Sequence, residues 1–447
     1  MIPAISTAAI YSTLGSTQSL IPIFVKDTLN SIGLTTGSYI TGKKLEAKDR
    51  FIDEFGTQAL WLLGIPVYKW AFENTVFKAM DYDPKFDVRN FKNKKVLEQI
   101  QKFAAKDNSE FQAVIKKAIA NEKILKNLTY TRFGFSTAAA IITYLGLTAF
   151  RQKDTEKCAK KEILAERAKR LQKHTYFGAE NSENKTESLP EDKKPNSHPA
   201  FTGKHEAFEA FMFNPVRNLM ILDGAITTSR FGKSRNRQDV IGYTVKEGSC
   251  WLFLYLLVGK IRDALEKRTF DKHNKLITLD STVIESKEFK KILESNDLEN
   301  HIKNFKEIAE KSDDVIYEYI YNNRGNSVVK VAEMSGSTSS HHNIIPLTKD
   351  NKIDTRKYID INEVKGICKK LEKVKENFQN SGEPIDVFLN QLRKHKRASI
   401  IANLAICVAA IGVIAPAIMV ALRFADKNNK NFQVKEDLAK ELDLVAA

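Results

Sequence analysis

Two short motifs place a lysine, an aspartate and an arginine at alternating positions. These residues are Lys85, Asp87 and Arg89 in KFDVRNF, and Lys352, Asp354 and Arg356 in KIDTRKY. Basic side chains bind phosphate and carboxylate oxygens, and an arginine fork does so with two parallel hydrogen bonds. The six residues are therefore candidate ligand-binding residues for an anion or a lipid headgroup. The alternative, which we favour, is an Asp–Arg ion pair that fixes a turn within the chain.

The rest of the sequence lacks the spacings of familiar catalytic and metal sites. It contains no phosphate-binding glycine loop, dinucleotide-binding glycine motif, zinc-protease motif or serine-nucleophile motif. The four cysteines form no close pair. The one adjacent histidine pair, His341–His342, lies in a serine-rich stretch, and neighbouring side chains rarely point toward one metal. We therefore expect no enzyme activity, no catalytic or metal-binding residue and no cofactor.

The two motifs belong to a longer internal similarity. Residues 41–63 align with residues 231–253 without a gap, and both blocks continue directly into a short apolar segment. Identical residues in the alignment are Gly42 and Gly232, Lys43 and Lys233, Asp49 and Asp239, and Trp61 and Trp251. A Lys-x-Asp-x-Arg motif, an amphipathic stretch and a long uncharged run follow in the same order. This order predicts an internal duplication, with one repeat at residues 25–152 and the other at 214–425.

Roles in the repeat signature follow from residue type. The Gly–Lys pairs are expected to mark turns, because glycine tolerates tight backbone conformations. The aligned tryptophans are expected to pack or to anchor at a membrane interface, where their amphipathic rings are enriched.

Four apolar segments locate a bilayer. Residues 398–422 carry no charge, and a helix of that length covers about 37 Å, which exceeds the roughly 30 Å hydrocarbon layer. Residues 133–150 are also uncharged and reach the lower limit for spanning. The alternative for both is a buried helix of a soluble protein. The shorter segments at 55–72 and 248–260 either span or re-enter the membrane, and their length leaves both options open.

Charge is distributed unevenly around these runs. The chain has 447 residues and a net charge of +15, and residues 151–173 contain nine basic and four acidic side chains. Basic residues beside a membrane helix favour the anionic cytoplasmic leaflet, although a solvated helix has the same composition. We expect a lipid bilayer as partner, with its anionic leaflet, and a protein partner or a second copy in addition. Nucleic acid is not expected, because the basic residues are mixed with acidic ones.

The remaining segments complete the predicted organisation. They are a weakly apolar N-terminal segment at 1–24, a basic helix at 153–177, a disordered linker at 178–203, an inserted polar helical region at 268–350 with a candidate strand at 328–331, and a polar tail at 426–447.

The predicted fold class is mainly α: a helical integral membrane protein with an internal duplication and helical regions outside the membrane. Its predicted location is a membrane, with the polar regions on the cytoplasmic side. The expected function is that of a membrane-embedded structural or interaction protein. The alternatives are a membrane carrier or channel built from the two repeats, and a soluble, all-helical basic binding protein. The long apolar runs lack charged residues, which weakens the carrier hypothesis.

Overall fold

A computed structural model describes most of the chain. The described residues are 7–16, 19–107, 109–174, 209, 212–294, 307–308, 310–335, 344–425 and 432–446. The predicted linker at 178–203 and the pair His341–His342 lie outside them. The described part is mainly α-helical, which confirms the coarse fold class, and it contains only an isolated bridge between Leu347 and Ile353 rather than a strand.

The candidate strand at 328–331 is wrong, because this segment lies in helix α15 (Ser327–Met334). Asn326 caps the helix, since its side chain accepts a hydrogen bond from the backbone N–H of Val328 at 2.8 Å. The buried residues Val328, Val331 and Ala332 then fall on one helical face. Capping and tertiary burial together outweigh the preference of valine for strands.

The chain forms two compact units, each assembled from three stretches. Unit 1 comprises Met1–Lys26, Leu62–Ala139 and Trp251–Ala409. Unit 2 comprises Asp27–Trp61, Ala140–Cys250 and Ala410–Ala447. Several helices continue from one unit into the other, so each unit depends on segments far apart in the sequence.

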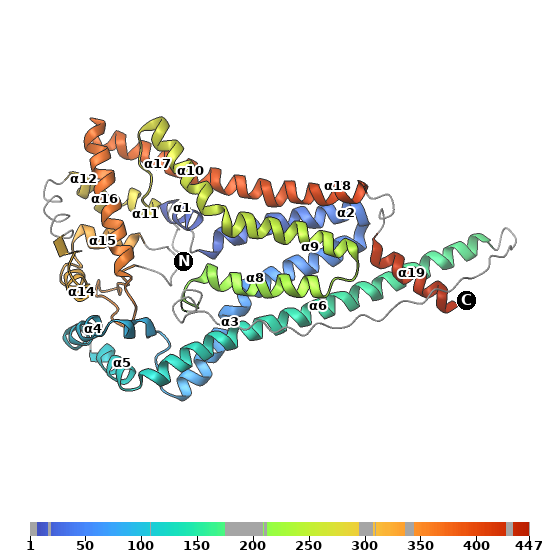
Figure 1. The fold of residues 1–447 in the computed structure, drawn as a ribbon, viewed down its shortest axis with the longest axis horizontal. Helices are drawn as coiled ribbons and strands as arrows, with labels where there is room; N and C mark the ends of the chain where they lie inside the picture. The colour runs from blue at the N-terminus through green and yellow to red at the C-terminus, as the bar shows by residue number, and fades with distance from the viewer. Residues whose placement is uncertain are drawn as a thin grey trace. The chain divides into compact units, whose positions relative to one another are not determined.

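Long helices make up unit 2, and they lie side by side in Figure 1. They include parts of α2 (Leu20–Ala59) and α6 (Glu122–His174), with α8 (Pro215–Gly232), α9 (Arg237–Cys250), the end of η5 (Ala409–Ile414), α18 (Ala415–Ala425) and α19 (Gln433–Ala446). Helix α8 begins in a standard way: Asn214 caps it by accepting the N–H groups of Val216 and Arg217, and Pro215 occupies its first turn.

Helix α2 reverses direction midway. A straight helix would place residues 31 and 58 about 40 Å apart, yet Gln58 donates a hydrogen bond to Ser31 at 3.1 Å. Thr28 also contacts Gln58, at 3.5 Å. The reversal therefore falls near residues 42–45, and α2 is a hairpin with a first arm at residues 20–40 and a second arm at 45–59 (Figure 1).

Small residues bring the first arm of α2 against the last apolar helix. A Cβ atom added to Gly33 would lie 2.2 Å from the backbone oxygen of Gly412, closer than any real contact. A Cβ atom on Gly37 would meet Val420 at 3.3 Å. Close backbone approach at small residues is a common way for helices to associate in membranes.

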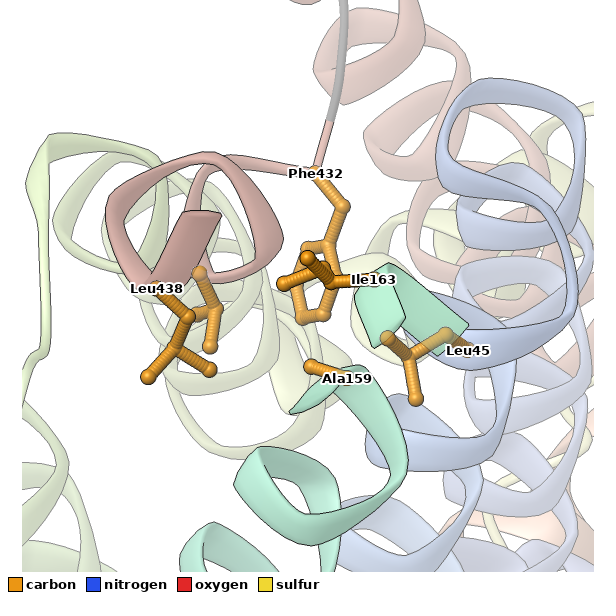
Figure 2. Packing of buried hydrophobic residues seen from close by; sticks show 6 residues of the cluster. Leu45, Ala159, Ile163, Phe432 and Leu438 are labelled. Atoms are coloured by element: carbon orange, nitrogen blue, oxygen red, sulfur yellow. The ribbon is translucent and has the colours of Figure 1, made fainter. Parts of the chain in front are cut away.

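Helix α19 packs against α6 and the second arm of α2 through a small hydrophobic cluster (Figure 2). Its members are Leu45, Ala159, Ile163, Phe432, Val434 and Leu438. Ion pairs flank the cluster: Lys435 contacts Glu162 at 3.1 Å and Glu166 at 2.8 Å. The segment predicted as a polar tail thus contains an amphipathic helix that packs on unit 2.

Shorter helices predominate in unit 1, together with residues of α2, α6 and η1 (Leu60–Gly64). The remaining elements are α1 (Thr7–Gly15), α3 (Ile65–Phe72), η2 (Glu73–Phe77), η3 (Val88–Lys92), α4 (Lys94–Asp107), α5 (Ser109–Ala120), η4 (Trp251–Leu256), α10 (Val258–His273), α11 (Ser281–Glu285), α12 (Lys287–Glu294), α14 (Asp313–Asn322), α15, α16 (Ile361–Ser381) and α17 (Ile385–Val408). Helix α14 packs on α4 and α16, with the rings of Phe103 and Tyr321 stacked at 3.8 Å. Helix α17 packs on α1, α10 and α11.

Candidate functional site

Two aspartates that the sequence alignment matches lie on either side of one arginine. Arg235 precedes α9, and its Nη2 atom lies 2.8 Å from Asp49 on the second arm of α2. Its Nε atom lies 2.8 Å from Asp239 on α9. The two carboxylates are only 7% and 9% exposed, so the guanidinium joins them in a nearly dry environment. One partly buried arginine therefore links α2 and α9.

A second aspartate of α2, Asp53, lies between two more guanidinium groups. Arg151 of α6 approaches its carboxylate at 3.3 Å, and Arg230 of α8 approaches at 3.4 Å. All three side chains are at most 3% exposed. Glu54, the next residue, pairs with Lys246 of α9, and Arg230 also pairs with Glu247.

These ion pairs connect into a single group, which we call the ionic core. Its acidic members are Asp49, Asp53, Glu54, Asp239 and Glu247, and its basic members are Arg50, Arg151, Arg230, Arg235 and Lys246. Acids and bases are equal in number, so the group is formally neutral. Neutrality and mutual pairing explain its burial, because an isolated buried charge is very costly.

Hydroxyl groups complete the ionic core. Thr155 of α6 donates a hydrogen bond to Asp49 at 2.6 Å, and Thr227 of α8 donates to Glu247 at 2.9 Å. The hydroxyl oxygen of Tyr243 accepts a hydrogen bond from Arg151 at 3.0 Å. The Tyr243 ring also lies under Arg50, with 5.6 Å from the guanidinium carbon to the ring centroid. The core therefore draws on α2, α6, α8 and α9 together.

The sequence contains a signal for the ionic core that charge counting overlooks. In α2 the polar residues 49, 50, 53, 54, 57 and 58 recur at helical spacing and define one face. That face leads without a break into the apolar segment at 55–72. A charged stripe on a helix is ordinarily solvated, and the partners on α6, α8 and α9 are more than 90 residues away, so their convergence was not predicted.

A cavity of about 70 Å³ lies beside the ionic core within unit 2. It is lined by Glu46, Asp49, Arg50, Gln238, Asp239, Ile241, Gly242, Met419, Leu422, Arg423 and Phe432. Arg423, the residue that ends the last uncharged run, pairs with Glu46 and donates to Thr41 Oγ1 at 3.2 Å. The lining thus combines carboxylates, guanidinium groups and an apolar wall. It has room and polarity for several waters or a small polar molecule.

The six candidate ligand-binding residues of the Lys-x-Asp-x-Arg motifs lie in unit 1, where each arginine pairs with its own aspartate. Arg89 Nη2 lies 2.7 Å from Asp87, and Arg356 Nη2 lies 2.9 Å from Asp354. In both motifs the aspartate also accepts the arginine backbone N–H, at 3.0 and 3.2 Å. The same local turn is therefore built twice.

The two motifs also touch one another. The backbone N–H of Asp87 donates to the carbonyl oxygen of Arg356 at 2.8 Å, and the Arg89 guanidinium stacks on the Tyr358 ring at 4.6 Å. Burial acts to lower the pKa of Arg89, but pairing with Asp87, together with the nearby Tyr358 and Asp360, makes the net shift upward. The motif lysines take other positions: Lys352 donates to the Asp107 carbonyl oxygen at 3.1 Å, and the Lys85 backbone N–H donates to Asp83.

The other residues of the repeat signature fall at structural transitions. Gly42 and Lys43 lie at the reversal of α2, whereas Gly232 ends α8 and the exposed Lys233 follows it. Trp61 is buried in the π-helical turn η1, and Trp251 opens the π-helical turn η4, where its ring lies 5.3 Å from that of Tyr255.

Two further observations bear on activity: the arrangement of possible metal ligands and the similarity to known proteins. Within the described residues, no group of three or more histidine, cysteine, aspartate or glutamate side chains is arranged to hold a metal ion. No protein-family model, curated protein or solved structure matches the chain.

Proposed function

We propose that the chain is a helical integral membrane protein. Two of its helical stretches, Glu122–Arg170 and Ile385–Ala425, are long and apolar enough to cross a bilayer. Only 33% and 28% of their most apolar windows are buried within the structure. A core helix of a soluble protein is mostly buried, so the exposure of these windows favours a lipid environment over the soluble alternative.

Large apolar side chains are also exposed in the shorter apolar segments. Their exposure supports the proposal that these segments lie in the membrane as well. Trp70 of α3 is 65% exposed, Leu63 of η1 is 59% exposed and Leu256 of η4 is 59% exposed. Exposed large apolar side chains gathered along one apolar segment are typical of membrane or partner contacts. Meanwhile the ionic-core residues of α2 and α9 pair inward. Apolar side chains outside and ion pairs inside are what a bilayer demands of a helical bundle.

We further propose that the two halves are related by duplication. The ion pairs Asp49–Arg235 and Glu54–Lys246 show that the second arm of α2 and α9 run in the same direction. Each is preceded by a reversal at an aligned Gly–Lys pair and followed by a π-helical turn that contains an aligned tryptophan. With the repeated Asp–Arg turns, these matches support parallel rather than inverted repeats.

The proposed role is that of a membrane-embedded structural or interaction protein. The observation that carries this proposal is the formally neutral ionic core, in which acidic and basic side chains of α2, α6, α8 and α9 pair with one another and fasten the four helices. The polar helices of unit 1 then provide the surface for a partner. Extraction of membranes with alkaline carbonate tests the membrane assignment: the chain should stay in the pellet, and release without detergent would contradict it.

One observation favours a second candidate, a carrier for a small polar solute. The cavity beside the ionic core offers carboxylates and guanidinium groups together, which suits a zwitterion. Thermal unfolding of the detergent-purified chain with glycine, acetate or inorganic phosphate tests this role. Stabilisation by glycine that disappears in Glu46→Gln and persists in the conservative control Met419→Leu would support the carrier. Equal midpoints with and without all three probes would favour the structural role.

A further inference from the structure

One end of unit 2 carries a concentration of exposed basic side chains. They come from the α2 reversal, from α6 and from the α8–α9 turn, and we call them the basic collar. The members are Lys44, Lys153, Lys157, Lys160, Lys161, Lys233 and Arg237. Within the described residues, none of them forms an ion pair with a carboxylate.

Contacts place these three stretches at the same end of the unit. Gln152 of α6 donates a hydrogen bond to the carbonyl oxygen of Lys233 in the α8–α9 turn at 3.0 Å. Lys48, just after the α2 reversal, pairs with Asp154 of α6 at 2.7 Å. Both helix reversals therefore lie beside the part of α6 that begins at residue 151.

Three of the four acidic residues of the same stretch form internal ion pairs, with two lysines between them. Asp154 pairs with Lys48, and Glu162 and Glu166 both pair with Lys435 of α19. Glu156 is the exception, since it forms no ion pair within the described residues. Three of the four acids in residues 151–173 therefore have ion-pair partners, whereas the collar lysines of the same stretch are exposed and form no ion pair within the described residues.

Exposed apolar side chains lie next to the collar along each chain segment. Ile40, four residues before Lys44, is 60% exposed, and Phe150, three residues before Lys153, is 62% exposed. Apolar side chains followed within one helical turn by lysines match the change from acyl chains to headgroups, where long basic side chains extend to the interface.

A competing basic cluster precedes the last apolar run, in unit 1, but part of it is paired internally. Lys396 pairs with Glu266 at 2.9 Å, and Arg397 pairs with Glu285 at 2.7 Å. Orientation in the membrane follows the excess of lysine and arginine near the helix ends. The collar, whose members are exposed and unpaired in the described structure, is therefore the stronger determinant.

We propose that the basic collar binds the anionic lipid headgroups of the bilayer, so that both helix reversals face the cytoplasmic leaflet. This inference rests on the proposed membrane function and adds to it a lipid class and an orientation. Anionic headgroups attract juxtamembrane lysines, and that attraction weakens as salt screens it.

Thermal unfolding in lipid nanodiscs tests the lipid class. The full chain in nanodiscs that contain phosphatidylglycerol should unfold at a higher temperature than in phosphatidylcholine alone, and added salt should reduce the difference. The collar variant Lys153→Gln, Lys157→Gln, Lys160→Gln, Lys161→Gln should lose most of it. A control with the same charge change elsewhere, Lys267→Gln, Lys369→Gln, Lys370→Gln, Lys373→Gln, should keep it. Equal losses in both variants, or no lipid dependence in the native chain, would overturn the proposal.

The source of the anion and the orientation need separate measurements. Soluble glycerol phosphate should not reproduce the stabilisation, because the collar spans several headgroups; full stabilisation by it, or retention of RNA instead of lipid, would refute a lipid surface. For orientation, Lys233→Cys in a Cys158→Ala background should react with a membrane-impermeant maleimide in inverted vesicles and not in intact cells of a bacterial host. Labelling of intact cells would overturn the orientation.

Failure of this inference is distinguishable from failure of the membrane assignment. If the chain resists carbonate extraction but its unfolding temperature does not depend on anionic lipid, the proposed membrane function stands and the lipid-binding role of the basic collar is refuted. Release of the chain by carbonate would refute both the membrane assignment and the role of the basic collar.

Discussion

Asp49 and Asp239, which stand at the same position of the two aligned sequence blocks, are bound by one guanidinium group, that of Arg235. Two carboxylates that lie against the same side chain repel one another, and both are largely removed from water. Their burial is therefore unfavourable without the cation that they share. The arginine has no counterpart in the first block, where Leu45 occupies the aligned position. The aspartate is thus repeated in the two aligned blocks, as Asp49 and Asp239. The arginine that binds both, Arg235, occurs in the second block only.

The first prediction follows from this relationship. Arg235→Gln should reduce the free energy of unfolding by about 3 kcal/mol, because it leaves the buried Asp239 without its ion-pair partner and leaves Asp49 with Arg151 alone, at 3.5 Å. Equilibrium unfolding in detergent measures the loss. Adding Asp239→Asn should recover part of it, and the exposed neighbour variant Arg237→Gln should leave stability nearly unchanged. A stability of Arg235→Gln equal to that of the native chain would contradict the role of the ionic core.

The second prediction concerns the close approach of α2 to the last apolar helix. Gly33→Ala should destabilise by about 1–3 kcal/mol, because its Cβ atom would meet the Gly412 carbonyl oxygen and push the helices apart. Gly146→Ala on α6 is the matched control, since nothing lies within 4 Å of its added Cβ. That control should be neutral or stabilising by up to about 1 kcal/mol through helix propensity. A gain in stability for Gly33→Ala with a loss for Gly146→Ala would refute the packing argument.

The third prediction separates the two interpretations of the Lys-x-Asp-x-Arg motif. Arg356→Gln should lower stability by about 2 kcal/mol, because the guanidinium pairs with Asp354 and with Asp83 at 2.9 Å each. Titration calorimetry with inorganic phosphate should show no binding in either the native chain or the variant. Phosphate binding that Arg356→Gln abolishes would restore the ligand-binding hypothesis. Arg262→Gln, in an exposed ion pair with Asp263, is the control and should change little.

The fourth prediction concerns thiol reactivity. Burial, with a further contribution from Glu372, raises the pKa of Cys368 to about 12. At pH 8 its reactive thiolate form is therefore scarce, and the side chain is covered. In the native chain, the half-buried Cys158 should react with a thiol reagent and Cys368 should react only after unfolding. Counting released chromophore before and after denaturation measures this; rapid labelling of Cys368 in a Cys158→Ala variant would contradict it.

Amphipathic periodicity and apolar run length are local properties, so the sequence predicts helices from them. The mainly α-helical fold follows from such signals, and the aligned Gly42 and Gly232 do mark chain reversals in the structure. The strand predicted at Val328–Val331 failed for the converse reason: valine preference is a weak local signal, whereas the cap at Asn326 and burial of one face depend on the surrounding fold.

The ionic core lay beyond sequence reasoning because it depends on long-range pairing. Arg50 lies one helical turn before Asp53, at 4.0 Å, but the closer cations Arg151 and Arg230 reach it from helices α6 and α8. In a sequence a charged residue carries no mark of whether water or another chain segment surrounds it. The long apolar runs contain no charged residue, but the ionic core begins just outside one of them, at Arg151. The charge content of the runs therefore gave no sign of it.

The sequence by itself determined where helices form and which segments lack charge, because hydrophobic periodicity and charge act over a few neighbouring residues. Only the tertiary structure decided that α2 folds back on itself, that its charged face is buried, and that α19 pairs with Glu162 and Glu166. These outcomes depend on which helices meet, since the free energy of a buried charge is set by its partner and not by its position in the chain.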